Sequence, residues 1–532
     1  MTTNQLSLSD SYTDQNWGWL IQEHEVSFDS LEIRKRLSNL ENPCYIVKDN
    51  ETLGIGTQRS DTHDKKNTFE TRAYTPAFQP GQLGDPEFKK TYGTKYSYYA
   101  GAMANGIASE EMVIALGKAG FLASFGAGGL VPARIETAIQ RIQQALPNGP
   151  YGFNLIHSPA EPALERGSVD LYLKYGVRCV EAAAFIALTP NVVRYRVAGL
   201  SLNADNEIEI KNRIIAKISR REVAAKFMEP PPEKIVQQLL AQGLISDQQA
   251  ALAAKVPMAD DITAEADSGG HTDNRPLVSL VPSIIALRDE IQAKYQFARL
   301  VRIGAGGGIG TPEAALAAFA MGAAYVVTGT VNQGCVEAGA CEHTKKLLSQ
   351  ADMADVAMAP ASDMFEMGVK LQVLRRGSFF PMRAQKLYDL YNTCNSIEEI
   401  PAAVRASLEK QVFRKNLDTV WEETKIFFEG RDPSQIVSAE KDPKKKMALI
   451  FRWYLGFASR WSNTGEKGRE MDYQIWCGPC IGAFNAWVKN SYLEDVKNRR
   501  VADVAEHILR GAAFLYRIQM LRNQGVIVPP EL

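Results

Sequence analysis

Short apolar runs alternate with Ala-rich helical patterns from about residue 97 to residue 331. Such runs, bounded by turn residues, are typical of strands buried on both faces, and their alternation with helices predicts parallel strands joined by crossovers. Eight strands are the number that closes a (β/α)8 barrel, so we predict an α/β fold of the TIM-barrel class, with an open doubly wound sheet as the alternative. The predicted strands are residues 97–104, 121–125, 151–156, 177–182, 214–219, 261–266, 300–305 and 324–329.

The regions before and after these alternating strands and helices differ from them in composition and in the spacing of apolar residues. Residues 1–90 are polar and turn-rich, which predicts a small N-terminal α+β segment ahead of a barrel at 91–385. Three prolines followed by two amphipathic patterns predict a helical insertion in the barrel at 230–255. Later windows carry apolar residues at i, i+3, i+4 and i+7. They predict a helical cap at 386–500, placed over the C-terminal face of the barrel, and a final helix in 501–532 that returns to the barrel wall.

Composition and charge narrow the class of protein. The 532 residues are 45% apolar and 23% charged, as in an ordinary globular chain and unlike a disordered one. Lys and Arg number 60 against 61 Asp and Glu, and this balance argues against a nucleic-acid-binding protein. The seven cysteines do not suggest a disulfide framework, and the first residues lack a signal-peptide pattern, so we expect a cytoplasmic protein. The most apolar stretch, 314–331, is broken by Gly322 and Gly329, which predicts no membrane span.

A glycine run follows the seventh predicted strand. It reads GAGGGIG at 304–310 and leads into a helix. Glycines let consecutive backbone N–H groups face one concavity, and a helix N-terminus adds positive partial charge. Loops after strands seven and eight commonly bind phosphate in (β/α)8 enzymes, whereas Ile309 does not fit the dinucleotide fingerprint. Plain tight turns are the alternative. The expected phosphate-binding residues are Gly307, Gly308, Gly329 and Thr330.

The sixth predicted strand ends in the segment EADSGGH at 265–271. Catalytic groups of barrel enzymes lie at the C-terminal ends of the strands. Gly269 and Gly270 would let a flat ligand approach the backbone, and His271 would face that ligand as a proton donor or as a polariser of a carbonyl group. A purely structural histidine is the alternative.

The loops after the first strands carry small residues that leave room for a planar ring, among them Ala102, Met103, Gly128 and Gly129. Asn154, at the end of the third strand, offers an amide that can pair with the edge of a heterocycle. Lys217 in the fifth strand supplies a positive charge that could stabilise an anionic ring, although a lysine in a barrel strand often pairs with a carboxylate instead.

Six segments, in this order, resemble the FMN-binding barrels of the nitronate monooxygenase and FabK type. They are GAM at 101–103, GAGGL at 126–130, NL at 154–155, EADSGGH at 265–271, AGGGI at 305–309 and VTGT at 327–330. Longer segments resemble one branch, the PfaD enoyl reductases of polyunsaturated fatty acid synthases and the trans-acting enoyl reductases of polyketide synthases. These segments are MANGIASEEMVIALGKAGFLASFGAGG, EADSGGHTDNRPL, MAPASDMFEMGVKLQVLRRG and DYQIWCGP.

The resemblance implies an FMN-dependent reductase of 2-enoyl thioesters carried on an acyl carrier protein, with NADPH or NADH as hydride donor. We also expect a homodimer, and a cap over the C-terminal face that shapes an acyl tunnel. Met103, Gly128, Gly129, Asn154 and Lys217 would surround the flavin ring and ribityl chain, the glycine loops would hold the phosphate, and His271 would lie at the reacting face. An oxygen-using nitronate monooxygenase and a non-catalytic docking subunit are the alternatives. A basic surface would receive the acidic carrier protein, with Arg375, Arg376 and Arg383 as candidates.

One motif matches an unrelated protein. Trp476-Cys-Gly-Pro-Cys480 has the letters of the thioredoxin active site, but a polar, charged segment precedes it where thioredoxin chemistry would need a buried strand. We therefore predict a packed turn at the start of a helix. The six histidines show no spacing typical of a metal site, so no metal is expected.

Overall fold

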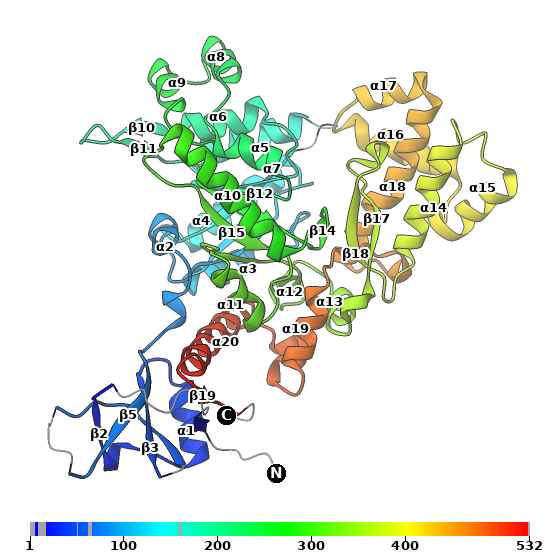
Figure 1. Ribbon diagram of the computed structural model, residues 1–532. Helices are drawn as coiled ribbons and strands as arrows, with labels where there is room; N and C mark the ends of the chain where they lie inside the picture. The colour runs from blue at the N-terminus through cyan, green and yellow to red at the C-terminus, as the bar shows by residue number, and fades with distance from the viewer. Residues whose placement is uncertain are drawn as a thin grey trace. The chain divides into compact units, whose positions relative to one another are not determined.

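The computed structural model describes residues 6–8, 17–50, 52–61, 66–157, 159 and 162–529 (Figure 1). The chain forms two compact units. One comprises Met1–Pro86, Pro312–Ala320 and Ala505–Leu532, and the other comprises Glu87–Thr311 and Met321–Val504.

The larger unit contains a closed barrel of eight parallel strands, and each strand overlaps one that the sequence predicts. The strands pair in chain order, and the last pairs with the first through Val326 and Tyr98. The predicted TIM barrel is therefore confirmed. The barrel strands are β6 (Tyr98–Ala100), β7 (Leu122–Phe125), β8 (Gly152–Ile156), β9 (Cys179–Ala183), β12 (Arg213–Ile218), β13 (Asp261–Glu265), β15 (Arg302–Gly306) and β16 (Val326–Thr328).

Helices alternate with these strands, and α3 and α6 begin at side-chain caps. The Ser109 hydroxyl accepts a hydrogen bond from the Met112 backbone N–H at the start of α3, and Thr189 does the same for Val192 at the start of α6. The helices are α2 (Pro86–Tyr92), α3 (Glu110–Lys118), α4 (Pro132–Ala145), α5 (Pro162–Lys174), α6 (Pro190–Ala198), α7 (Arg221–Met228), α10 (Leu277–Tyr295) and α11 (Pro312–Ala320). The predicted insertion holds α8 (Glu233–Ala241) and α9 (Asp247–Ala253), and an unpredicted hairpin, β10 (Leu200–Leu202) and β11 (Ile208–Ile210), precedes β12.

Buried ion pairs tie the N-terminal ends of the barrel strands together. The Arg302 guanidinium at the start of β15 binds both carboxylate oxygens of Asp261 at the start of β13, at 2.7 and 2.8 Å. The Tyr92 hydroxyl donates to the same carboxylate. A bidentate pair fixes the relative geometry of its two side chains as well as pairing their charges. In barrel proteins the N-terminal ends of the strands contribute to stability and the active site lies at their C-terminal ends, so the functional site is expected at the opposite face.

A small sheet that the sequence did not predict joins the barrel to the cap. Its strands are β14 (Gly270–His271), β18 (Lys370–Leu374) and β17 (Val356–Pro360), all antiparallel. His271 of β14 lies opposite Leu371 of β18. His271 is thus held in a strand that belongs to this second sheet, several residues beyond the barrel strand β13.

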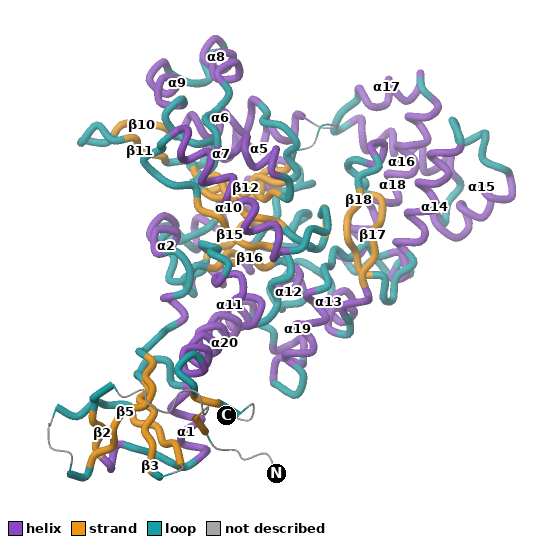
Figure 2. Tube along the Cα trace, in the orientation of Figure 1, coloured by secondary structure: helices purple, strands orange, loops and turns teal. Residues whose placement is uncertain are grey.

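Helices form most of the chain after β18 and are drawn in purple in Figure 2. Asp472, fully buried among them, binds the guanidinium groups of Arg383, Arg414 and Arg469 and the hydroxyl of Tyr454. This carboxylate is the polar centre of the cap. The cap elements after β18 are α14 (Phe380–Thr393), α15 (Ala402–Leu408), η6 (Glu409–Phe413), α16 (Leu417–Glu429), α17 (Ser434–Lys441), α18 (Pro443–Thr464) and α19 (Cys480–Val488). Two further helices, α12 (Thr330–Gln333) and α13 (Glu342–Ser349), lie between β16 and β17.

The smaller unit is built on an antiparallel sheet of four strands in the order β2-β5-β3-β4. Arg517 of the last helix is buried and donates hydrogen bonds to the backbone carbonyls of Leu37, Asn39, Asn42 and Pro76, which fixes the helix to this sheet unit. The elements are β1 (Ser7–Leu8), β2 (Leu20–Gln22), α1 (Ser30–Ser38), β3 (Cys44–Asp49), β4 (Thr52–Gly56), β5 (Thr68–Thr75), α20 (Val501–Arg522) and β19 (Val526–Ile527).

Within this unit α20 packs against α11, the helix that follows β15 in the chain. A Cβ atom on Gly511 of α20 would lie 2.5 Å from Pro312 of α11, so the two helices meet at van der Waals distance only because residue 511 is glycine.

Candidate functional site

A cavity of about 1520 Å³ opens at the C-terminal ends of the barrel strands. Its walls are the loops after the barrel strands, the β17–β18 loop, and the cap helices α16 and α18. A typical site for one small ligand has about 300–1,000 Å³. The cavity therefore has room for a cofactor together with part of a second ligand. Every residue for which the sequence suggests a cofactor or catalytic role lines this cavity.

The two predicted phosphate loops meet on one wall. Gly307 and Gly308 have φ angles of +82° and +78°, a left-handed conformation that glycine adopts without strain. A Cβ on Gly308 or Gly329 would meet no atom of the described chain within 4 Å, so these backbones border open space. Thr330, next to them, begins the short helix α12. Bare backbone and a hydroxyl at a strand end suit a phosphate group.

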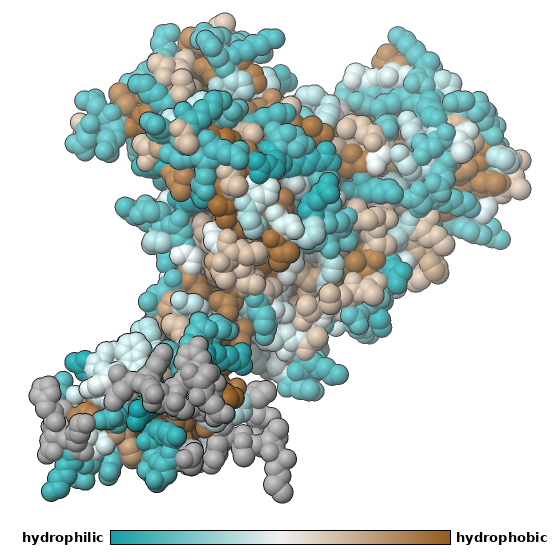
Figure 3. All heavy atoms as spheres, viewed as in Figure 1, coloured by the Kyte–Doolittle hydropathy of each residue, from teal (hydrophilic) through white to brown (hydrophobic). Residues whose placement is uncertain are grey.

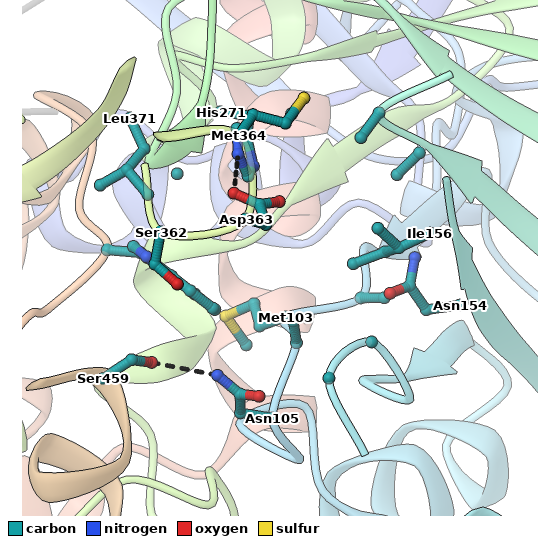
Figure 4. A pocket seen from close by; sticks show the side chains of 18 of the residues that line it. Met103, Asn105, Asn154, Ile156, His271, Ser362, Asp363, Met364, Leu371 and Ser459 are labelled. Carbon is teal, nitrogen blue, oxygen red and sulfur yellow. Dashed lines mark hydrogen bonds and ion pairs between the residues drawn. The ribbon is translucent and has the colours of Figure 1, made fainter. Parts of the chain in front are cut away.

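The loops after β6 and β7 form the floor of the cavity, beside Asn154 and Ile156 (Figure 4). A Cβ on Gly128 would lie 2.2 Å from Ile156 Cδ1 and 2.9 Å from Asn154 Oδ1, so only glycine lets the loop come this close. The Asn154 side-chain amide donates to the backbone carbonyl of Glu181 at 3.3 Å. A flat, narrow floor with an amide at its edge can accept a planar heterocycle.

Lys217 lies between two carboxylates that the sequence analysis did not single out. Its Nζ is 3.1 Å from Glu265 Oε1, and Glu181 lies close enough to interact with its charge. Burial opposes the positive charge, but the two carboxylates outweigh it and raise the pKa of Lys217. The pairing left open in the sequence analysis is therefore observed, and the raised pKa favours a charged ammonium group in the cavity wall.

The two carboxylate oxygens of Glu181 differ in their hydrogen bonding. Its Oε2 accepts hydrogen bonds from the Tyr99 hydroxyl at 2.6 Å and the Ala102 N–H at 3.0 Å, while its Oε1 has no hydrogen-bond partner among the described residues. Burial, the largest influence, raises the pKa of Glu181. A buried acceptor without a partner is costly, so this atom suits a donor on a bound ligand.

His271 faces the cavity with a partner that sequence reasoning missed. Its Nε2 lies 3.1 Å from Oδ1 of Asp363, which belongs to the loop between β17 and β18 (Figure 4). Burial disfavours the charged imidazolium, but the Asp363 carboxylate outweighs it, and the pKa of His271 is raised. Burial would raise the pKa of Asp363, but His271 outweighs this effect and lowers it. The pair therefore favours a protonated histidine and an ionised carboxylate at the cavity wall.

The cap reaches the same floor from the other side. The side-chain amide of Asn105, after β6, donates to the Ser459 hydroxyl of α18 at 3.1 Å (Figure 4). The apolar residues Phe427, Trp453 and Phe457 of the cap helices line the cavity as well. The cap thus covers the C-terminal face of the barrel, the position expected for it.

The thioredoxin-like pentapeptide forms a packed turn, as the sequence predicts. Helix α19 begins at Cys480, directly after Pro479. Cys477 is fully buried, and burial raises the pKa of its thiol; burial likewise raises the pKa of Cys480 to about 11. Reactive thiols need the opposite, a lowered pKa and an accessible sulfur atom.

The three arginines suggested for partner binding differ from one another. Arg383 binds the buried Asp472, so it is a structural residue of the cap and does not contribute to a basic surface. Arg376 is half-exposed and lies 3.2 Å from Asp355, and Arg375 is exposed.

No helix of the described chain is long and apolar enough to span a bilayer. On the face drawn in Figure 3, hydrophilic and hydrophobic residues are interspersed over α8 and α9.

Three family descriptions match successive parts of the chain. Residues 86–420 match nitronate monooxygenase, residues 19–77 match the fatty acid synthase subunit PfaD N-terminal domain, and residues 394–473 match the inserted helical domain of [acyl-carrier-protein] S-malonyltransferase. Barrel and cavity thus belong to an enzyme of the oxidoreductase class that the first of these descriptions names. The chain belongs to the nitronate monooxygenase family and carries a PfaD-type N-terminal domain.

Individual relatives point to one branch of that family. The chain is 50% identical over 502 residues to a polyunsaturated fatty acid synthase polypeptide of Thraustochytrium sp., and the match covers 92% of this chain and 33% of the relative. It is 46% identical over 439 residues to polyketide biosynthesis protein PksE of Bacillus subtilis, covering 82% and 57%. The chain thus spans about a third of the first relative and somewhat over half of the second.

A solved structure resembles most of this chain. The enoyl reductase domain of MlnA, from the macrolactin biosynthesis cluster of Bacillus amyloliquefaciens, has a TM-score of 0.79 and 40% sequence identity. The match covers 83% of this chain and 99% of that domain. The recognised resemblance to the PfaD branch is therefore confirmed.

Proposed function

We propose that this chain is an FMN-dependent enoyl reductase that reduces 2-enoyl thioesters on an acyl carrier protein with NADPH or NADH, in the synthesis of polyunsaturated fatty acids or polyketides. The observation that carries the proposal is the cavity, which gathers the two phosphate loops, the flat floor and the His271–Asp363 pair. The likeness to the MlnA enoyl reductase domain supports it.

The cavity wall offers matching groups for each part of FMN. Gly307, Gly308, Gly329 and Thr330 would hold the phosphate. The floor, formed by Ala102, Met103, Gly128, Gly129 and Asn154, would hold the ring and ribityl chain, with Gly269 and Gly270 bordering the ring from the side of β14. When bound, FMN supplies hydride transfer from a nicotinamide to the β-carbon of an enoyl thioester.

The side chains of this protein supply the charges for that reaction. Reduction of an enoyl thioester develops negative charge on the thioester oxygen, and protonation at Cα completes it. His271, kept protonated by Asp363, can donate a hydrogen bond to that oxygen or a proton to Cα. Lys217, held charged by Glu181 and Glu265, places a cation beside the cofactor floor, where it would stabilise an anionic reduced ring.

The remaining volume suits an acyl chain. Apolar side chains of α16 and α18, among them Phe427 and Trp453, face the cavity across from the floor. An acyl chain bound there would exclude water from the reduced flavin. The relatives belong to multi-component synthases, which supports a carrier protein as the partner that delivers the chain. Arg375 and Arg376 stay candidates for meeting its acidic surface, and a cytoplasmic homodimer is the assembly that we propose.

The test begins with an absorbance spectrum of the protein reconstituted with FMN. NADPH or NADH should bleach the flavin bands under anaerobic conditions, and a crotonyl thioester on a carrier protein should restore them. A protein that binds no flavin, or a reduced flavin that the thioester does not reoxidise, would refute the proposal.

The family match at 86–420 favours a second candidate, oxidation of alkyl nitronates by oxygen. Rapid oxygen consumption with a nitronate and no need for a nicotinamide would establish that activity in place of enoyl reduction.

A further inference from the structure

The turn at residues 476–480, here called the clasp, comes from the cap but lies against loops of the barrel. The Gly478 backbone N–H donates to the Thr330 hydroxyl at 3.1 Å, and the Cys477 N–H donates to the Gln372 carbonyl at 3.3 Å. The carbonyl oxygen of Cys480 lies where a Cβ on Gly310 would be only 2.8 Å away. The clasp therefore contacts the β13–β14, β15–α11 and β16–α12 loops, which include both proposed phosphate loops.

Two glycines make the closest of these approaches possible. A Cβ on Gly269 would lie 2.7 Å from the Cys477 nitrogen, and a Cβ on Gly478 would lie 2.9 Å from the Gly269 nitrogen. Real Cβ atoms essentially never come within 3.0 Å of such backbone atoms. The clasp and the β13–β14 loop thus touch backbone to backbone, and a methyl group on either side would push them apart.

The contact also sets the direction of the Thr330 hydroxyl. A threonine hydroxyl has one proton to donate and two lone pairs. Because Gly478 donates to Thr330, the threonine keeps its own proton to donate. Thr330 and Cys480 both line the cavity, and the Thr330 hydroxyl lowers the pKa of the Cys480 thiol against the effect of burial. A phosphate oxygen could accept the threonine proton in place of the thiol.

We propose that the clasp is a positioning element for the phosphate of the cofactor: it holds the phosphate loops in register and orients Thr330, so that the cap sets the affinity for FMN. The inference rests on the proposed function, since it requires the loops at Gly307 and Gly329 to bind phosphate. It assigns the thioredoxin-like pentapeptide a backbone role in which neither sulfur atom reacts.

The experiment compares Gly478→Ala and Gly269→Ala with wild type and with a control, Gly430→Ala. Gly430 is a cap glycine where a Cβ would meet no atom of the described chain within 4 Å, at a φ of −82° that alanine tolerates. The Kd of each protein is measured for FMN and for riboflavin, which lacks the phosphate. We expect the Kd for FMN to rise about tenfold or more in both clasp variants, the loss typical of a hydrogen bond to a charged group. Riboflavin affinity should change little in Gly478→Ala, whose residue does not line the cavity, and Gly430→Ala should match wild type.

A double variant, Gly269→Ala with Gly478→Ala, adds a second criterion. Both substitutions open the same contact, so the double variant should bind FMN about as well as either single variant, and the effects should not multiply. The rise in melting temperature on adding FMN reports affinity even where the cofactor-free protein has become less stable.

Each outcome decides the matter. An unchanged Kd for FMN in Gly478→Ala would refute the proposed role of the clasp. An equal loss of affinity for FMN and for riboflavin in that variant would refute it as well. A wild-type protein that binds neither flavin would instead overturn the proposed function. Cys480→Ser, which keeps a small polar side chain, should retain FMN affinity, and a large loss there would contradict a role carried by the backbone.

Discussion

Asp363→Asn removes the charge that faces His271 while keeping the shape and one hydrogen bond of the side chain. The Nε2 and Oδ1 atoms are 3.1 Å apart, and the two side chains are 33% and 35% exposed. At this separation two unit charges attract by about 5 kcal/mol at an effective dielectric constant of about 20 and by about 1 kcal/mol in bulk water. Because each group is about one-third exposed, solvent screening brings the useful interaction close to the lower limit. We take about 1.4 kcal/mol, which corresponds to a factor of ten.

The sign of the effect follows from the direction of the pKa shift. The carboxylate raises the pKa of His271, so the imidazolium persists to higher pH in the wild-type protein than in the variant. The variant should therefore lose about tenfold in enoyl-reduction turnover near neutral pH and regain much of it as the pH falls. The stabilisation of the fold by this pair is full between the two pKa values: it is lost as the pH rises through the raised pKa of His271 and as the pH falls through the lowered pKa of Asp363.

The assay is the rate at which an enoyl thioester reoxidises the NADPH-reduced enzyme, measured anaerobically across pH. Because the chain has six histidines, NMR can follow the His271 ring in parallel. Asp355→Asn, which removes the carboxylate that pairs with Arg376 outside the cavity, is the matched control and should leave the profile unchanged. A profile in Asp363→Asn that coincides with wild type, or an equal loss at every pH, would refute the reasoning.

Three further predictions follow from the same contacts. His271→Ala should keep the flavin colour and lose about 10²–10⁴-fold in turnover with crotonyl thioesters, and unchanged turnover would remove His271 from the reaction. Asp472→Ala leaves the buried guanidinium groups around it without their carboxylate and should lower the free energy of unfolding by about 3–5 kcal/mol in urea titrations; a loss below about 1 kcal/mol would contradict its central role. Gly126→Ala would put a Cβ 1.7 Å from the Met103 carbonyl oxygen and should destabilise the protein and reduce its flavin content, whereas the control Gly430→Ala should do neither.

The sequence by itself was sufficient for the barrel and for a set of residues that line its cavity. Strands buried on both faces leave a local signature, a short apolar run between turns, and all eight barrel strands carry it. The glycine-rich loops and the histidine at the end of a strand are likewise recognisable from a few neighbouring residues, because glycines leave the backbone N–H groups accessible to a ligand. Once the strands close into a barrel, their C-terminal ends must converge, and the predicted residues meet in one cavity.

Only the tertiary structure showed which partners those residues have. Asp363 follows His271 by 92 positions, and no local pattern signals that an antiparallel pairing of β14 with β18 brings the two together. Glu181 and Glu265 on either side of Lys217, and the backbone contact of Gly269 with Gly478, are likewise products of strand order and cap position. Periodicity and composition describe a chain over a few residues, whereas the charge state of a histidine or lysine depends on groups that only folding makes its neighbours.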